Sequence, residues 1–290
     1  MEVLPGDPAE MMLGIDASAD AIAALRMRLG LDADPLRRYL DWLGHVAVGN
    51  FGLSYTWSVP VWTLVEERMA VTLPLALLAM AMTAAIALAM GVYAAANHNR
   101  PADFAIMAAS QVGIAVPSFW VAILLILLFA VQLGWVSPGG FPGWGRGFGS
   151  ALLSLLLPAL SLTLVQAAIL ARVSRSAVLE VLQEDFIRTA RAKGLGRRAV
   201  LWRHALRNAL IPIVTVMGLQ FSGLLAGTIV IENVFSLPGL GRLVFQAISN
   251  RDLIVVKSVV LLLAAKVVVM NYLIDLLYLA IDPRLLVRDR

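Results

Sequence analysis

The chain has 290 residues, of which 60% are hydrophobic and only 14% are charged. This composition is too apolar for a soluble globular domain and indicates an integral membrane protein. A net charge of +4 does not point to nucleic acid, because the basic residues flank apolar stretches, where membrane topology explains them. Cysteine is absent, which excludes disulfides and thiolate metal sites.

The first 69 residues are polar and acidic, with Asp and Glu outnumbering Arg two to one. This segment contains no apolar stretch long enough to cross a membrane. Two short amphipathic helices are predicted within it, over 20–29 and 34–48. In the second helix we expect Asp34 to be the N-cap and Pro35 the first helical residue.

Five apolar stretches follow, at about 71–96, 106–132, 151–171, 209–231 and 255–281. Each is long enough for the roughly 20 helical residues that cross a bilayer. Prolines occur within or near the ends of four of them, where we expect kinks that serve helix packing: Pro74, Pro117, Pro158 and Pro212. The predicted fold class is therefore all-α, a polytopic membrane protein with five transmembrane helices in this chain.

A water-soluble insert separates the third and fourth apolar stretches, within 172–208. Good helix formers run from 184 to 193, Gly194 is expected to end that helix, and a second helical run begins near Arg197. The apolar side chains of this insert are expected to share one face: Phe186, Ile187, Ala190, Leu195, Val200 and Leu201.

The basic residues predict the orientation of the chain, because short cytoplasmic loops carry an excess of Lys and Arg. Residues 172–207 contain nine of them and are therefore placed inside. Alternating the spans puts 97–103 and the C-terminal tail inside, and 1–69, 137–150 and 232–253 outside. The chain then divides into an extracytoplasmic segment, 1–69, and a transmembrane domain, 70–290.

Several stretches resemble the membrane permeases of binding-protein-dependent ABC importers of the dipeptide, oligopeptide and nickel class. The insert carries RTARAKGL (188–195) and RHALRNALIP (203–212), which resemble that class's version of the EAA loop. Ala190 and Gly194 match the second alanine and the glycine of the E-A-A-x-x-x-G pattern, whereas Arg188 and Thr189 depart from it. The similarity extends to GNFGLS (49–54), VPSFWVAILLILLFAVQLGW (116–135) and IENVFSLPGLGRL (231–243).

This resemblance implies that the insert is a coupling helix that contacts a cytoplasmic ATPase. The implied coupling residues are Phe186, Arg188, Thr189, Ala190, Arg191, Lys193, Gly194 and Leu195. The implied partners are a second homologous permease, two ATPase subunits, an extracytoplasmic solute-binding protein and membrane lipid, in the bacterial inner membrane. No G-x-x-x-x-G-K-[ST] motif occurs in the sequence, so we expect no enzymatic activity and no cofactor in this chain, with ATP and Mg²⁺ bound by the partners.

The family has six transmembrane helices, one more than the sequence shows. A polar segment of about 70 residues needs a preceding helix or a signal peptide to cross the membrane. LPGDP, at 4–8, resembles the stretch that follows the family's first helix. Both observations favour a further helix encoded upstream of Met1; the alternative is translocation by a route that the sequence does not show.

Polar residues near the membrane-spanning part are candidates for pathway or inter-helix roles: Glu232, Lys266, Asn271 and Asp275. Lys266 and Asp275 are nine residues apart, on opposite faces of one helix, so they cannot pair. We expect Asn271 and Asp275 to hold helices together. For Lys266, a position facing the pathway or the second permease and a snorkelling side chain both remain open.

Two other classes of protein remain to be distinguished from an importer. An ion-gradient-driven secondary carrier would show paired repeats with broken helices and its own coupling carboxylates, and the sequence shows neither. A purely structural scaffold does not explain the basic insert. The sequence does not specify the transported substrate within the peptide class.

Overall fold

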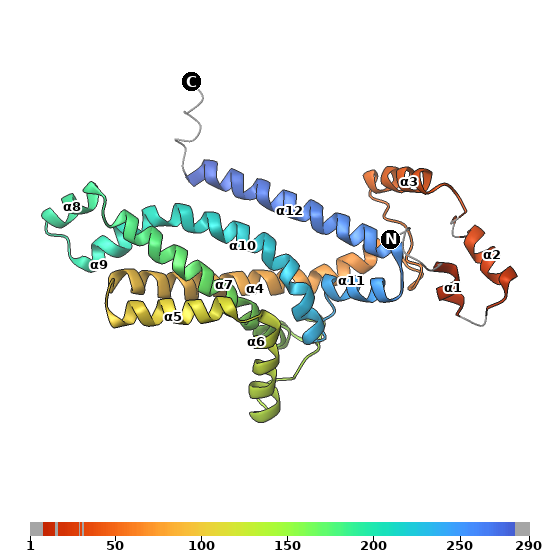
Figure 1. The fold of residues 1–290 in the computed structure, drawn as a ribbon, viewed down its shortest axis with the longest axis horizontal. Helices are drawn as coiled ribbons and strands as arrows, with labels where there is room; N and C mark the ends of the chain where they lie inside the picture. Colours follow the sequence, from red (N-terminus) through yellow and green to blue (C-terminus); the bar gives the residue numbers. More distant parts are fainter. Residues whose placement is uncertain (1–7, 15–16, 29, 31, 282–290) are drawn as a thin grey trace, which may run out of the picture. The chain divides into compact units, whose positions relative to one another are not determined.

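The computed structural model describes residues 8–14, 17–28, 30 and 32–281. The chain forms two compact units, residues 1–71 with 238–265 and residues 72–237 with 266–290. Every regular element among the described residues is a helix (Figure 1). The predicted all-α class is confirmed.

The first unit begins with three short helices, α1 (Pro8–Leu13), α2 (Ala19–Arg28) and α3 (Pro35–Ala47). The second and third coincide with the two helices predicted from the sequence. The Asp34 carboxylate accepts hydrogen bonds from the backbone N–H groups of Leu36 and Arg37, each at 3.1 Å. Asp34 is therefore the N-cap, and Pro35 occupies the first turn as expected.

The core of the first unit combines the start of α4 (Val61–Ala96), α11 (Leu240–Ser249) and the start of α12 (Leu253–Ile281). The sequence did not predict α11, which occupies ten residues of the segment 232–253. Four apolar side chains of α11 recur at helical spacing and are buried: Leu240, Leu243, Val244 and Ala247. The turn-forming residues at 236–239 precede this short amphipathic helix, and for that reason the sequence did not predict it.

Asp252 joins the parts of this unit. Its carboxylate is fully buried and accepts hydrogen bonds from the Ser54 hydroxyl at 2.6 Å and the Thr56 N–H at 2.9 Å. It also accepts a hydrogen bond from the Val255 N–H at 3.2 Å, at the start of α12. We call residues 51–57 and 252–258 the Asp252 hub.

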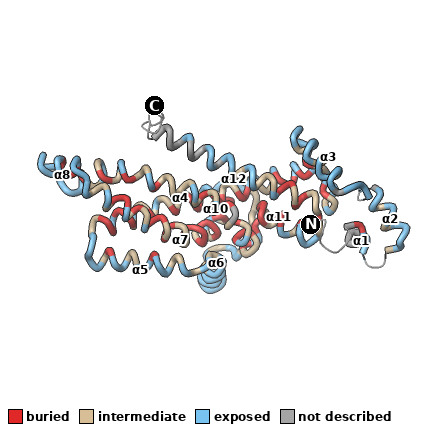
Figure 2. The backbone as a smooth tube through the Cα atoms, turned by 45° about the horizontal axis from the view of Figure 1, so that its top comes forward, coloured by how far each residue is buried: buried red, intermediate tan, exposed pale blue. Residues whose placement is uncertain are grey.

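The second unit is a helical bundle built around α7 (Phe148–Val181). The other elements are the rest of α4, α5 (Pro101–Ala115), α6 (Ser118–Leu125), a π-helical turn (Ile126–Gln132), a 3-10 turn (Trp144–Arg146), α8 (Asp185–Ala192), α9 (Arg197–Ala199), a second π-helical turn (Val200–Ala205), α10 (Leu206–Val234) and the end of α12 from Lys266. Helix α7 packs against α5, α6 and α10. Figure 2 shows buried residues concentrated along α7, whereas α6 and α8 are mostly exposed.

Small residues bring α4 and α7 into close contact. A Cβ atom added to Gly91 would lie 2.5 Å from the Ser174 Cβ and 2.8 Å from the Ala171 carbonyl oxygen. Nearby, the Thr163 hydroxyl donates a 3.1 Å hydrogen bond to the carbonyl oxygen of Ala79. Close backbone approach through small residues is typical of helices packed within a membrane.

Among the described residues, three helices are long and apolar enough to cross a membrane: Val61–Ala96, Phe148–Val181 and Arg197–Leu225. They contain the predicted spans 71–96 and 151–171 and most of 209–231. The pair formed by Pro101–Ala115 and Ser118–Gln132 would make a fourth. The predicted fifth span, 255–281, coincides with α12, part of whose side chains lies outside the described structure; its crossing of the membrane stays a prediction.

The second predicted span, 106–132, is not one straight helix. Its two halves are bent by 99° at Val116 and Pro117 (Figure 1). Val116 has an extended conformation, with φ −91° and ψ 126°, which a following proline favours by disfavouring the helical region. Pro74, Pro158 and Pro212 lie within continuous helices. At Pro117 the expectation of a packing kink is wrong, because the helix ends there; at the other three prolines the kink stays a prediction.

Candidate functional site

The water-soluble insert folds into a small structure of its own, and we call residues 184–207 the bracket. Helix α8 ends where predicted, because Gly194 has a φ of +80°, in the left-handed region that favours glycine. Its N–H donates to the Arg191 carbonyl oxygen at 2.9 Å, and the Leu195 N–H donates to that of Ala190 at 3.3 Å. The chain then turns into α9, which begins at Arg197 as expected.

The bracket has its own apolar core. Ile187 and Ala190, three residues apart on one face of α8, are buried against Val200 and Ala205. Val181 and Leu182, at the end of α7, pack against the same cluster. The bracket is therefore a packed extension of α7 and α10.

The surface of the bracket exposes large apolar side chains beside charged ones. The exposed fractions are 43% for Phe186, 41% for Leu195 and 52% for Trp202. Arg188 forms a 3.1 Å ion pair with Asp185, but both side chains are exposed, so this pair contributes only about 0–1 kcal/mol. Aromatic side chains left in solvent on a basic, folded surface indicate a site of protein contact.

The structure separates the eight predicted coupling residues into two groups. Seven are exposed: Phe186, Arg188, Thr189, Arg191, Lys193, Gly194 and Leu195. Ala190 is buried, so its small size serves the packing of the bracket itself. An added Cβ at Gly194 would meet nothing within 4 Å, so glycine is favoured there by backbone conformation. Contact of these residues with an ATPase stays a prediction.

An ion pair that sequence reasoning missed joins the start of α5 to α7. The Arg175 guanidinium donates to both carboxylate oxygens of Asp103, with Nε–Oδ1 at 2.5 Å and Nη2–Oδ2 at 2.7 Å. The backbone N–H of Asn99 donates to the same carboxylate at 3.0 Å. Hydrogen bonding to Arg175 is the main cause that lowers the pKa of Asp103 to about 2, against the effect of burial.

Sequence reasoning treated Arg175 only as one of the basic residues that fix topology. Its partner is 72 residues away, and their pairing depends on how α5 packs on α7. The available signal was Asp103 itself, the one carboxylate in the predicted inner loop 97–103. A lone acid beside an apolar span is a candidate for pairing with a cation.

Two candidate pathway residues are buried in the second unit. Glu232, in α10, is fully buried, and its Oε1 accepts a 2.6 Å hydrogen bond from the Thr72 hydroxyl of α4. The Lys266 ammonium nitrogen, in α12, is buried without a hydrogen-bond partner among the described residues. A buried ammonium group without a hydrogen-bond partner is costly, so Lys266 is a candidate for a further contact.

The other two predicted polar residues lie further along α12. The Asn271 Oδ1 accepts a 3.2 Å hydrogen bond from the Ser222 hydroxyl of α10. This contact agrees with the predicted role in holding helices together. Asp275 lies in α12, but its side chain is outside the described part of the structure, as are Arg284, Arg288 and Arg290 of the tail.

Fold and bracket together define a class of protein, a multi-pass helical membrane protein with a folded basic insert on one surface. Residues 87–287 match the family model described as the binding-protein-dependent transport system inner membrane component. The match covers well over half of the chain. The chain therefore belongs to this family, and it is a permease subunit of an ABC importer in the inner membrane.

Relatives with assigned names support this assignment. A Brucella suis protein, whose name describes a peptide transport system permease, is 44% identical over 284 residues, covering 98% of this chain and 90% of that protein. The glutathione transport system permease protein GsiC of Salmonella choleraesuis is 40% identical over 283 residues, covering 98% of this chain and 90% of GsiC. None of this supports the alternative of an ion-gradient-driven carrier.

A solved structure of the methionine ABC transporter MetNI, in inward-facing conformations, has a similar fold. The TM-score is 0.64 at 20% sequence identity, and the match covers 76% of this chain and 96% of that chain. At this identity the similarity concerns the fold alone.

Proposed function

We propose that this permease moves peptides across the inner membrane, sharing the translocation pathway with a second homologous permease. The substrate class is supported by the relatives, which are named for peptides and for glutathione, itself a small peptide. A binding protein outside the membrane delivers the peptide. Two ATPase subunits inside supply the energy.

The proposed topology places five spans of this chain in the membrane, with the bracket inside and residues 1–69 outside. This assignment rests on the nine basic residues of 172–207, because cytoplasmic loops carry an excess of Lys and Arg. The bend at Pro117 then lies within the second span, where non-helical backbone is tolerated if neighbouring helices satisfy its polar groups. Residues 70–290 form the transmembrane domain.

The packed core of the bracket is the observation that supports its role in coupling the ATPase to the membrane helices. Because Ile187 and Ala190 are buried against Val200 and Ala205, a force applied to α8 is transmitted to the helices on either side. A loose loop of the same sequence would absorb that force. The exposed side chains Phe186 and Leu195 provide the apolar contact with the ATPase.

The energy source lies outside this chain. Its sequence has no phosphate-binding P-loop, so the partner ATPases bind ATP and Mg²⁺ and hydrolyse the nucleotide. The permease itself performs no chemistry and holds no cofactor. Its task is to change which side of the membrane the pathway faces.

Glu232 and Lys266 are the residues that we assign to the pathway or to the contact with the second permease. A buried carboxylate and a buried ammonium group in membrane helices are retained at a cost, which indicates function. If Lys266 faces the pathway, Lys266→Met will reduce transport without changing assembly of the complex. Normal transport by this variant would remove the pathway role.

Reconstitution tests the function directly. The permease, its partner permease, the ATPases and the binding protein are placed in proteoliposomes, and uptake of a labelled dipeptide is followed. We expect uptake that requires ATP and the binding protein and persists when ionophores remove ion gradients. Uptake that follows an ion gradient without ATP would contradict the importer assignment.

A further inference from the structure

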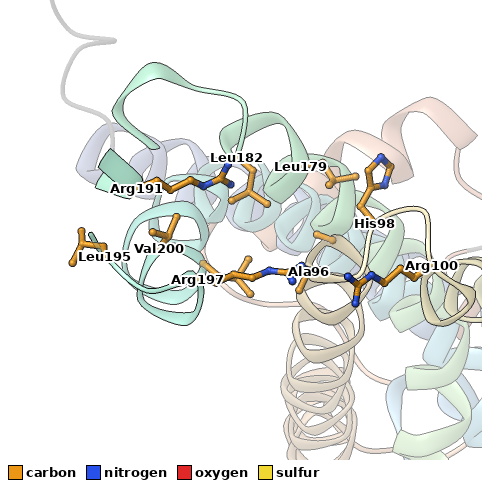
Figure 3. A pocket seen from close by; sticks show the side chains of 11 residues that line it. Ala96, His98, Arg100, Leu179, Leu182, Arg191, Leu195, Arg197 and Val200 are labelled. Atoms are coloured by element: carbon orange, nitrogen blue, oxygen red, sulfur yellow. Dashed lines mark hydrogen bonds between the residues drawn. The ribbon is translucent and has the colours of Figure 1, made fainter. Parts of the chain in front are cut away.

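A cavity of about 550 Å³ lies between the bracket and the turn that joins α4 to α5 (Figure 3). Its walls come from three places: residues 95–100 at the end of α4, residues 179–182 at the end of α7, and residues 191–201 of the bracket. All three belong to the second unit. The cavity is larger than a single anion needs and falls in the range that accommodates small-molecule ligands.

The cavity is strongly cationic. Arg100, Arg191 and Arg197 line it together with His98, and no carboxylate is among its described lining residues. In Figure 3 the side chains of Arg100 and Arg197 reach toward each other on either side of Ala96. Like charges facing one gap repel each other, so an anion between them would be strongly favoured.

The guanidinium groups are available for a ligand. Within the described structure the side chains of Arg100 and Arg191 make no hydrogen bond and no ion pair. Arg197 donates one hydrogen bond, to the carbonyl oxygen of Ala96, which holds it at the rim. Asp103 does not line the cavity, and its carboxylate is already engaged by Arg175. His98 lies 3.4 Å from this carboxylate, whereas the three cavity arginines have no acidic partner among the described residues.

The remaining walls are apolar. Leu179 at the end of α7 and Leu182 just after it line the cavity together with Val200 and Leu201 of the bracket. A ligand that fits must combine a compact anion with an apolar part. A phospholipid has both, in its phosphate and in the glycerol and first methylenes beneath it.

We propose that this cavity binds the headgroup of an anionic phospholipid of the inner leaflet. Arginine forks pair with phosphate oxygens in a bidentate manner, which makes three guanidinium groups a phosphate site in particular. The source is the membrane, because the cavity begins at Ala96, where the membrane helix α4 ends. This placement rests on the proposed inner position of the bracket. The bound lipid holds the bracket to the α4–α5 turn.

Native mass spectrometry of the full-length chain in detergent tests the proposal, with phosphatidylglycerol as the probe and phosphatidylcholine as the neutral comparison. The double variant Arg100→Gln/Arg191→Gln removes two cavity arginines. The matched control, Arg198→Gln/Arg203→Gln, removes two exposed arginines of the bracket that do not line the cavity. We expect phosphatidylglycerol binding to fall at least about tenfold in the cavity variant and less than about twofold in the control.

Other outcomes would overturn the proposal. Equal losses in both double variants would show general attraction between a basic surface and an anionic lipid. Unchanged binding in the cavity variant would show that the lipid binds elsewhere. Displacement of phosphatidylglycerol by an equal concentration of inorganic phosphate would identify free phosphate as the ligand. If the double variant does not fold, Arg100→Gln alone, outside the bracket, makes the same test with an expected loss of about threefold.

Lipid binding in detergent does not depend on transport or on the partner subunits. Failure of this experiment would therefore leave the importer assignment intact, and failure of ATP-driven uptake would leave the lipid site intact. If the cavity variant instead loses only ATPase association in lipid-free detergent, the cavity belongs to the protein interface and the lipid assignment is wrong.

Discussion

The Asp252 hub and the bracket use polar residues in opposite ways. In the hub, the buried carboxylate of Asp252 accepts three hydrogen bonds from within its own unit. In the bracket, Arg191, Lys193 and Arg198 are exposed and make no side-chain hydrogen bond or ion pair in the described structure. In the hub, the hydrogen bonds of the buried carboxylate are satisfied within the unit. In the bracket, these three cations are exposed and contribute no side-chain hydrogen bond or ion pair to the fold.

This difference distinguishes polar groups that the fold requires from polar groups that are available to a ligand or partner. A buried carboxylate without donors would cost several kcal/mol, so folding itself requires the partners of Asp252. Exposed arginines cost folding little and add little to it. Their concentration on one small surface therefore reflects topology and the ligands that we propose for it, an ATPase subunit and a lipid headgroup.

The largest effect is expected from removing the buried carboxylate of the Asp252 hub. Asp252→Ala leaves the Ser54 hydroxyl and two N–H groups without their acceptor, and we expect stability to fall by roughly 2–4 kcal/mol. The thermal midpoint of the full-length chain in detergent measures the change. Asp185→Ala, which removes a 93% exposed carboxylate in the bracket, is the control and should be nearly neutral. Equal effects at the two sites would contradict the distinction.

A smaller effect is expected from overpacking the bracket. Ala190→Leu adds three carbon atoms to its core and should destabilise it by about 1–3 kcal/mol, with loss of ATPase-coupled transport. Ala192→Leu makes the same substitution two residues away on the exposed side of α8 and should preserve both properties. Thermal unfolding and uptake in proteoliposomes are the two measurements. A tolerated Ala190→Leu would show that the bracket core is loose.

Backbone strain at Gly194 should cost less free energy but still affect coupling. Gly194→Val forces a β-branched residue into a φ of +80°, at a cost of about 1–2 kcal/mol, and should abolish transport while the protein remains in the membrane. Gly196 is the matched control, because its φ is −64° and open space surrounds it. Gly194→Asn should retain activity, since asparagine tolerates this conformation. Similar transport by the Gly194 and Gly196 valine variants would contradict the argument.

The last prediction concerns pH at the Asp103–Arg175 pair. The pKa of Asp103 is lowered from 3.8 to about 2, so the folded chain favours the ionised carboxylate more than the unfolded chain does. The pair's contribution to stability is therefore complete above about pH 4 and is lost as the pH falls toward 2. The thermal midpoint, scanned from pH 5 to pH 2, should decline more in the natural chain than in Asp103→Asn. Parallel declines would assign the acid sensitivity to other groups.

Local patterns predicted much of the fold. The caps at Asp34 and Gly194 were predictable because each depends on the conformation and hydrogen bonding of adjacent residues. The helices that contain 71–96, 151–171 and 209–231 follow from uninterrupted apolar composition. Helix α11 was missed because SLPGLG predicts a turn, and the partners that bury its apolar face come from α4, far away in the sequence, and from the following helix α12.

The position of the candidate site was predictable from the sequence. Which of its residues are buried and which are exposed was not. The sequence places Ala190 and Gly194 in one motif, yet only packing shows that Ala190 is enclosed by Val200 and Ala205 while Gly194 is open. The pairing of Asp103 with Arg175, and the cavity beside Arg191, depend on contacts between segments that are about 70 to 100 residues apart. Spacing along one helix contains no information about such contacts.

Site-directed cross-linking from the bracket tests the central claim most directly. The chain has no natural cysteine, so Phe186→Cys introduces the only thiol on the exposed face of α8. In native membranes the account predicts a cross-link between this thiol and an ATPase subunit, and no labelling by an impermeant maleimide added from outside. Labelling of Phe186→Cys from outside, or cross-links that never include an ATPase subunit, would contradict it.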